Sequence, residues 1–395
     1  MGKSDRFSVQ ASFVAPSLGI GLLVLSIAGS ESACSSAPAA GDGGAGGASG
    51  SGGGSGSGGS GGSSGESAGD CTVHRLAGGE TWFNAFGHDD TLVVYDAGKE
   101  ATHEFSLAPA SLTKKGTKAV GEVEREGYSS PRHVIGADAD YIYADEGSSA
   151  LPAPSTVGRA RWATLDKFEP WISTNDLPPN FEFTDVGKTY AIVTRTPTDM
   201  EPRRGVGVVA SNGKVWTADL PARPEGIMDL LVNTAPGDDL VFSTGTTLTR
   251  TPIDKYTPTI LFEATVPTSV ADRTPFGIVK PNASETRVFF RFIAPKSAAM
   301  GSGLYMVPKT GGAPKRIGES TDIVVPVDGK LVGASGSPIG AVPQTFFEMN
   351  EDGTNRRVIA TCGDLKEGLT DGHIVVTTNF VVVASANKII LAKRK

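Results

Sequence analysis

Short apolar runs separated by polar turns recur along most of the chain, at intervals that stay close to 48 residues. Seven of these runs directly follow a turn rich in Asp, Asn or Gly, and the residues that mark them are Leu92, Tyr141, Tyr190, Leu240, Val288, Leu331 and Val381. Successive markers are 49, 49, 50, 48, 43 and 50 residues apart. A period of this length is typical of repeat folds, in which each repeat forms one supersecondary unit.

Each repeat contains four short runs with the pattern of β-strands, and no long segment of the repeat region has helical periodicity. The stretch GLYMVPKTGGAPKRIGES shows half of one repeat, with strands predicted at 304–307 and 315–317 around a Pro and Gly turn. Four strands per repeat predict the blade of a β-propeller. We therefore expect an all-β propeller over residues 71–395, with seven four-stranded blades and six as the alternative count.

The two ends of the repeat region complement each other. The last repeat ends at NKIILAKRK, which predicts a third strand with no fourth after it, and CTVHRLA at 71–77 precedes the first complete repeat. We expect 71–77 to supply the missing fourth strand and to close the ring, because an open ring would leave unpaired strand edges. This arrangement brings Cys71 near Cys362, so that a disulfide and two free thiols are both open alternatives.

Three segments carry a resemblance to known propellers. The units GLYMVPKTGGAPKRIG, DADYIYADEG and FTDVGKTYAIVTR are similar to blades of TolB-like and YWTD-like propellers, and the similarity extends over most of 71–395. No repeat has a complete Tyr-Trp-Thr-Asp motif, and Tyr143 to Asp145 is the nearest approach. The resemblance implies the fold and leaves the function open, since propellers include enzymes, receptors and scaffolds.

The N-terminal region has the composition of an export signal. Lys3 and Arg6 precede an apolar segment at 13–28, which is followed by small residues up to Cys34. This order is typical of a secretory signal peptide, and the apolar segment is shorter than the roughly 20 residues of a membrane-spanning helix. We assign 1–33 to a signal peptide.

Residues 34–70 are predicted to anchor and tether the propeller. The plan resembles that of bacterial lipoproteins, whose lipidated Cys becomes the mature N-terminus, although Glu31 stands where an apolar residue is expected. Cleavage without lipidation, which gives a soluble secreted protein, is the alternative. The Gly- and Ser-rich remainder cannot bury apolar surface and predicts a disordered linker, with a reach of about 30 Å for about 30 residues.

No sequence motif of known chemistry occurs in the repeat region: G-x-S-x-G, H-E-x-x-H, C-x-x-C and the phosphate-binding loop are all absent. The net charge of −7 argues against a nucleic-acid partner. In a propeller the innermost strand of each blade borders a central channel, so residues near the starts of these strands gather around one axis. The repeat therefore predicts one set of polar residues at the channel. These positions are Asn84, His133, Glu182, Asp229, Asp322 and His373, with the apolar Phe276 in the fifth blade.

Two functions remain open. The first is a binding or scaffold module without a cofactor, exported and held by a lipid anchor at the outer membrane or cell surface, or else periplasmic or secreted. It would be a monomer whose partner is an envelope protein or a glycan. The second is an exported hydrolase or lyase that uses a divalent cation among the channel carboxylates and histidines. The lack of a catalytic motif favours the first function over an enzyme.

Overall fold

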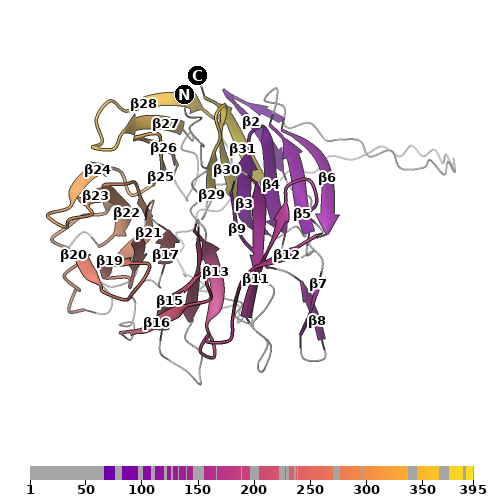
Figure 1. The fold of residues 1–395 in the computed structure, drawn as a ribbon. Helices are drawn as coiled ribbons and strands as arrows, with labels where there is room; N and C mark the ends of the chain where they lie inside the picture. The colour runs from indigo at the N-terminus through magenta and orange to yellow at the C-terminus, as the bar shows by residue number, and fades with distance from the viewer. Residues whose placement is uncertain are drawn as a thin grey trace, which may run out of the picture. The chain divides into compact units, whose positions relative to one another are not determined.

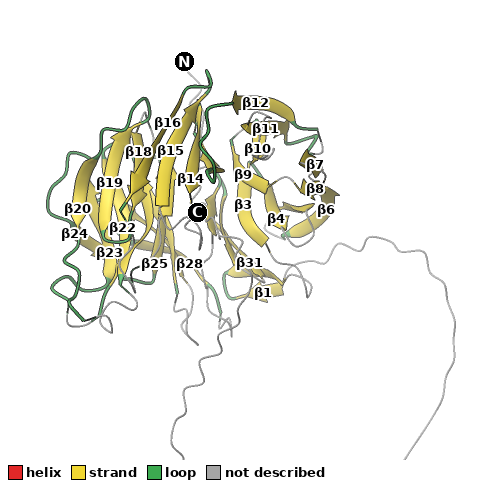
Figure 2. Cartoon of the chain, turned by 90° about the horizontal axis from the view of Figure 1, so that it is seen from below, coloured by secondary structure: helices red, strands yellow, loops and turns green. Residues whose placement is uncertain are grey.

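The structure is a computed structural model of the 395-residue chain. It describes residues 66–75, 82–96, 101–107, 112–119, 122–125, 128–131, 133–138, 140–145, 155–165, 167–187, 189–195, 204–221, 227, 231–234, 237, 239–269, 276–295, 298–336, 345–363, 373–385 and 388–394. Every regular element in these ranges is a β-strand, and Figure 2 shows the strands joined by loops. No helix in the described ranges is long and apolar enough to cross a membrane.

The strands form seven blades around a ring (Figure 1), each built on an antiparallel sheet of four strands, to which the last blade adds a fifth. Blade 1 consists of β3 (Trp82–His88), β4 (Thr91–Asp96), β5 (Ala101–Ser106) and β6 (Thr113–Ala119). Blade 2 consists of β9 (His133–Ala137), β10 (Tyr141–Asp145), β11 (Ser155–Arg161) and β12 (Glu169–Thr174). Blade 3 consists of β13 (Glu182–Val186), β14 (Tyr190–Arg195), β15 (Arg204–Ala210) and β16 (Val215–Leu220). A separate hairpin, β7 (Glu122–Arg125) and β8 (Tyr128–Pro131), lies between blades 1 and 2 in the sequence.

The other four blades continue the same order. Blade 4 consists of β17 (Leu231–Thr234), β18 (Asp239–Ser243), β19 (Thr247–Pro252) and β20 (Thr259–Glu263), and blade 5 of β21 (Gly277–Ala283), β22 (Arg287–Ile293), β23 (Gly303–Pro308) and β24 (Lys315–Gly318). Blade 6 consists of β25 (Asp322–Val327), β26 (Lys330–Ser335), β27 (Thr345–Asn350) and β28 (Arg357–Thr361). Blade 7 consists of β29 (His373–Val376), β30 (Phe380–Ser385) and β31 (Lys388–Lys393), and β2 (Cys71–Arg75) completes it. The prediction of seven blades is confirmed, and six is excluded.

Each of the seven marker residues lies in the second strand of its blade, because a tight polar turn reverses the chain just before it. The turn between β25 and β26 shows the local reason. Asp328 and Gly329 have φ angles of 51° and 75°, and an Asp-Gly pair adopts such left-handed conformations readily in two-residue hairpin turns. The regular recurrence of turns of this kind produces the period seen in the sequence.

The first strand of every blade is the innermost one. Each of these strands contacts the first strand of the next blade, in the closed order β3, β9, β13, β17, β21, β25, β29 and back to β3, and Figure 1 shows them around the centre of the ring. Since the strands are antiparallel, the connections that enter the first strands and those that join the second and third strands lie at one edge of the ring. We call this edge the loop edge.

The hydrophobic core consists of seven clusters, one at each interface between neighbouring blades. A blade therefore buries both of its faces, which explains why strands such as β14 are buried at every position instead of alternating. Trp162, Trp171 and Trp216 pack against these clusters. The side chain of Trp82 lies outside the described residues.

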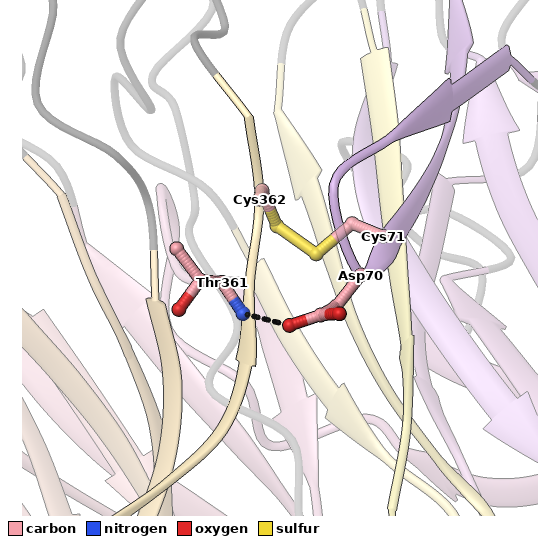
Figure 3. The surroundings of a disulfide bond; sticks show 4 residues. All are labelled: Asp70, Cys71, Thr361 and Cys362. Atoms are coloured by element: carbon pink, nitrogen blue, oxygen red, sulfur yellow. Dashed lines mark hydrogen bonds between the residues drawn. A yellow bond between two sulfur atoms is a disulfide. The ribbon is translucent and has the colours of Figure 1, made fainter.

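The ring closes as the sequence predicts. β2 pairs with β31 from Thr72 opposite Leu391 to Arg75 opposite Lys388, so that the N-terminal strand completes the last blade. A disulfide joins Cys71 to Cys362 with Cα atoms 5.1 Å apart, and beside it the Thr361 amide donates to Asp70 Oδ2 at 3.1 Å (Figure 3). The alternative of two free thiols is excluded.

One boundary of the predicted tether is wrong. β1 (Glu66–Ala68) pairs with the outer edge of β2 and adds a fifth strand to the last blade, although residues 66–70 were expected to belong to the disordered linker. Their Glu and Ser side chains gave no strand signal. They form a strand because the main chain of β2 offers unpaired hydrogen-bonding groups at its free edge.

Candidate functional site

The structure describes three of the six predicted channel side chains. Glu182 is the first residue of β13 and is exposed. Asn84 in β3 and His133 in β9 occupy inner strands as expected, but their side chains lie outside the described residues, as does the whole of Asp229. The channel site as a set therefore stays a prediction.

Asp322 starts β25 and is fully buried, and it holds an ion pair inside its own blade. Arg356 donates to both carboxylate oxygens, from Nη1 to Oδ2 at 2.6 Å and from Nη2 to Oδ1 at 3.0 Å, and the Glu319 amide adds a third bond at 2.9 Å. Arg356 also lies over the Phe347 ring at 3.7 Å. These contacts use both oxygens of Asp322 and give the carboxylate a structural role.

His373 starts β29 and is 3% exposed. Its cross-strand neighbour is Ala384, which belongs to the core cluster between blades 7 and 1. Because cross-strand neighbours share one face of a sheet, His373 is turned toward blade 1. Glu182, Asp322 and His373 therefore have three different environments, and no group of three His, Cys, Asp or Glu residues in the described ranges could hold a metal ion.

A pocket lies at the loop edge between blades 4 and 5. Its volume is about 340 Å³, which falls within the size range of small-molecule sites. Its lining comes from the end of β20 with the segment that follows, from Phe276 before β21, from β22 and from the connection between β22 and β23: Phe262, Glu263, Ala264, Thr265, Val266, Pro267, Thr268, Phe276, Phe292, Ala298, Ala299 and Met300.

The floor of the pocket is aromatic and fixed by packing. Phe276 and Phe292 are 0% and 1% exposed and meet edge to face at a ring separation of 5.2 Å. Phe262 on the side wall stacks on Phe290 at 5.4 Å. The apolar position among the channel residues, Phe276, thus belongs to the core between two blades and supports this pocket.

The walls are tied to the two blades by hydrogen bonds. On one side the Ala264 amide donates to the Thr246 carbonyl at 2.8 Å. On the other side Ser302 Oγ bonds both the amide and the carbonyl of Ala294 at 2.9 Å, and the Tyr305 hydroxyl donates to the Gly301 carbonyl at 2.7 Å. These bonds hold the Ala298–Ala299–Met300 segment in place, so that the hollow is preformed.

The chemistry of the pocket is simple. Among the lining residues that the structure describes, Glu263 is the only charged one, and the others are apolar apart from Thr265 and Thr268. The Met300 thioether can adapt to the shape of a bound group. The described lining thus surrounds the space with apolar side chains, and the exposed Glu263 supplies one carboxylate. The sequence did not reveal this site because no motif unites residues of two blades.

No protein-family model matches the sequence, and no curated protein matches it. Among solved structures, the chain is similar to the β-propeller domain of the Trilobed protease from Pyrococcus furiosus, at 10% identity and a TM-score of 0.45, covering 79% of this chain and 95% of that one.

Two further structures are a putative TolB from Agrobacterium tumefaciens and apo AztD from Citrobacter koseri. The first has 12% identity and a TM-score of 0.33 and covers 63% of this chain and 87% of that one. The second has 12% identity and a TM-score of 0.41, with 80% and 90% covered. Identities this low carry no conclusion about activity, and the strand order itself defines the chain as a seven-bladed β-propeller.

Proposed function

We propose that this protein is an exported binding module, held at a membrane by a lipid on Cys34, and that its propeller recognises an envelope protein. The observation that carries the proposal is the preformed apolar pocket at the loop edge. An apolar lining with one carboxylate suits a hydrophobic protein side chain better than a glycan, whose hydroxyl groups would need more polar partners.

The disulfide supports the export part of the proposal. Cys71 and Cys362 lie 291 residues apart and are joined at the point where the ring closes. Structural disulfides form and persist in oxidising compartments outside the cytosol. A tether between a lipidated Cys34 and the first strand would then separate the propeller from the bilayer, as the Gly- and Ser-rich composition of that segment suggests.

Filling the pocket should abolish binding of an apolar group. We expect the neutral dye N-phenyl-1-naphthylamine to bind the wild-type chain with one-to-one stoichiometry, and Ala299→Trp to weaken that binding at least tenfold, because the indole occupies the pocket from an exposed position. Fluorescence titration measures both. The control is Val358→Trp on β28, a residue that is 59% exposed and outside the pocket. Equal affinities for the two variants would contradict the assignment.

Replacing the predicted lipidation residue should release the protein from membranes. We expect the wild-type chain, expressed in a bacterial host, to partition into the detergent phase of Triton X-114 and Cys34→Ser to remain in the aqueous phase, because Ser provides no thioether attachment. Cys362→Ser serves as a control for the loss of a cysteine elsewhere. Identical partitioning of wild type and Cys34→Ser would reject the lipid anchor and favour the alternative, cleavage of the signal peptide without lipidation.

A further inference from the structure

Asp185 is a buried acidic residue on the inner strand of blade 3. It is 7% exposed and lies opposite Ile192 of β14, which packs with Leu240 and Phe242 of blade 4. Because cross-strand neighbours share a face, Asp185 is turned toward blade 4. The first strands of these two blades, β13 and β17, are in contact.

The two oxygens of Asp185 differ in their surroundings. Oδ1 accepts a hydrogen bond from the Val186 amide at 2.8 Å, whereas Oδ2 is buried with no hydrogen-bond partner among the described residues. An ionised carboxylate in this place would leave a buried charge without a cation, which is strongly unfavourable. Burial raises the pKa of Asp185 to about 7, and the Val186 hydrogen bond offsets only part of that effect.

Blade 5 has an asparagine at the same position. In each of these blades a hydrogen bond closes the turn between the first and second strands, from the Gly187 amide in blade 3 and from the Ser284 amide in blade 5. Asp185 and Asn282 each lie two residues before that amide. Both follow an irregularity in the pairing of the first two strands. Asn282 is 2% exposed, and its Oδ1 accepts from the next amide, that of Ala283, at 2.8 Å. The two side chains therefore make the same local contact.

The amide of Asn282 also makes a bond that a carboxylate cannot make. Its Nδ2 donates to the Val324 carbonyl at 3.4 Å, and Val324 lies in β25, the inner strand of the next blade. A neutral carboxylic acid has one acceptor oxygen and one O–H donor and can reproduce this pattern, whereas the ionised form only accepts.

We propose that Asp185 carries a proton in the folded protein and donates it in a hydrogen bond to the main chain of β17, so that it clasps blade 3 to blade 4 as Asn282 clasps blade 5 to blade 6. Loss of that proton replaces the hydrogen bond by repulsion between carboxylate and carbonyl oxygens. The clasp makes the contact between these two blades sensitive to pH.

Burial is the main cause of the raised pKa of Asp185, and no charged group among the described residues contributes to it. The buried Arg204 of β15 lies at the same interface but donates to the carbonyls of Pro221 and Thr244. β17 (Leu231–Thr234) contains no titratable residue. Glu182 lies at the far end of β13 itself, and His133, Asp145 and Arg195 lie at the corresponding ends of β9, β10 and β14. Arg195 is ion-paired with Asp219. On the face shared with blade 4, Tyr190 is 3% exposed and packs over Gly187. On β18, Asp239 pairs with Arg250 of its own blade and with Lys309 of blade 5.

The direction of the pH effect follows from linkage. The pKa of Asp185 is about 7 in the folded protein against an ordinary value of 3.8, so the folded state binds the proton more tightly than the unfolded state. Stability is therefore highest below pH 4 as far as this group is concerned, and it falls as pH rises from about 4 to about 7. Within that window each pH unit lowers the folding equilibrium constant about tenfold.

Two substitutions test the clasp through chemical denaturation of the full chain between pH 4 and 8.5. Asp185→Asn supplies the donor permanently, so we expect it to match the wild type at pH 4 and to exceed its folding equilibrium constant by about 10³-fold at pH 8. Asn282→Asp should do the reverse and install a second loss of stability with rising pH. A constant difference between wild type and Asp185→Asn across this range would overturn the proposal, as would a pH-independent effect of Asn282→Asp.

A direct measurement covers the case in which a variant does not fold. In the wild-type protein labelled with ¹³C at aspartate, we expect the carboxyl resonance of Asp185 to titrate with a midpoint near pH 7. That resonance is assigned through the Val186 amide, or by its absence from the spectrum of an Asp185 variant that folds. A midpoint near 4 for that carboxyl would show that Asp185 ionises normally and would overturn the clasp.

Discussion

A chain that begins at residue 78 is expected to melt more than about 10 °C below one that begins at residue 66. The shorter chain lacks β1 and β2, so β31 loses its partner over the four pairs from Thr72 to Arg75, and the cluster between blades 6 and 7 loses Cys71 and Val73. It also loses the disulfide. Together these losses lower the free energy of unfolding by more than about 5 kcal/mol. For a domain of this size, such a loss lowers the melting temperature by about 10 °C.

Intermediate chains separate the contributions. In residues 66–395 carrying Cys362→Ser, β2 can still pair, but the disulfide no longer constrains the unfolded chain. For a separation of 291 residues the chain-entropy value is about 6 kcal/mol, and measured effects reach from about 2 to 5 kcal/mol. Differential scanning calorimetry should therefore rank the full domain first, Cys362→Ser second and residues 78–395 last. Equal melting temperatures for residues 66–395 and 78–395 would show that the N-terminal strand does not close the ring.

Arg356→Ala is expected to destabilise the propeller by about 3–5 kcal/mol, because removal of one partner leaves a buried charge without its counter-ion. The carboxylate of Asp322 is 0% exposed and would keep only the hydrogen bond from the Glu319 amide. The contact of the guanidinium with the Phe347 ring would be lost as well. The free energy of unfolding in urea at pH 7 measures the effect.

The neighbouring turn provides a matched control. Arg316 and Glu319 form an ion pair at 2.6 Å, the same distance as between Arg356 and Asp322, but their side chains are 50% and 69% exposed. Exposed pairs contribute about 0–1 kcal/mol because water screens them. Arg316→Ala should thus cost much less than Arg356→Ala, and comparable costs for the two variants would mean that burial of Asp322 is not the cause.

The role of Asp322 also changes how a metal should be sought in the channel. A variant that removes Glu182, Asp229 and Asp322 together would break the Arg356 ion pair and could lose a metal merely by unfolding. Elemental analysis should therefore compare the wild type with Glu182→Ala and Asp229→Ala while Asp322 is kept, since Glu182 is exposed and its replacement leaves the core intact.

The sequence by itself determined the repeat, the number of blades and the strand that closes the ring. These features depend on local patterns, since apolar runs and turn residues recur within each repeat and the unpaired last strand is visible at the C-terminus. The disulfide stood open, because two cysteines 291 residues apart do not reveal their separation in space. β1 was missed, because its pairing depends on the free edge of β2 and not on its own composition.

Only the tertiary structure decided which polar residues face solvent, core or a partner. Asp322, Glu182 and His373 occupy equivalent places in the repeat, yet one is ion-paired, one is exposed and one is turned toward blade 1. The pocket and the environment of Asp185 likewise arise at interfaces between blades. A residue's partners there come from a repeat about 50 positions away, and the packing of two sheets, which no local pattern encodes, selects them.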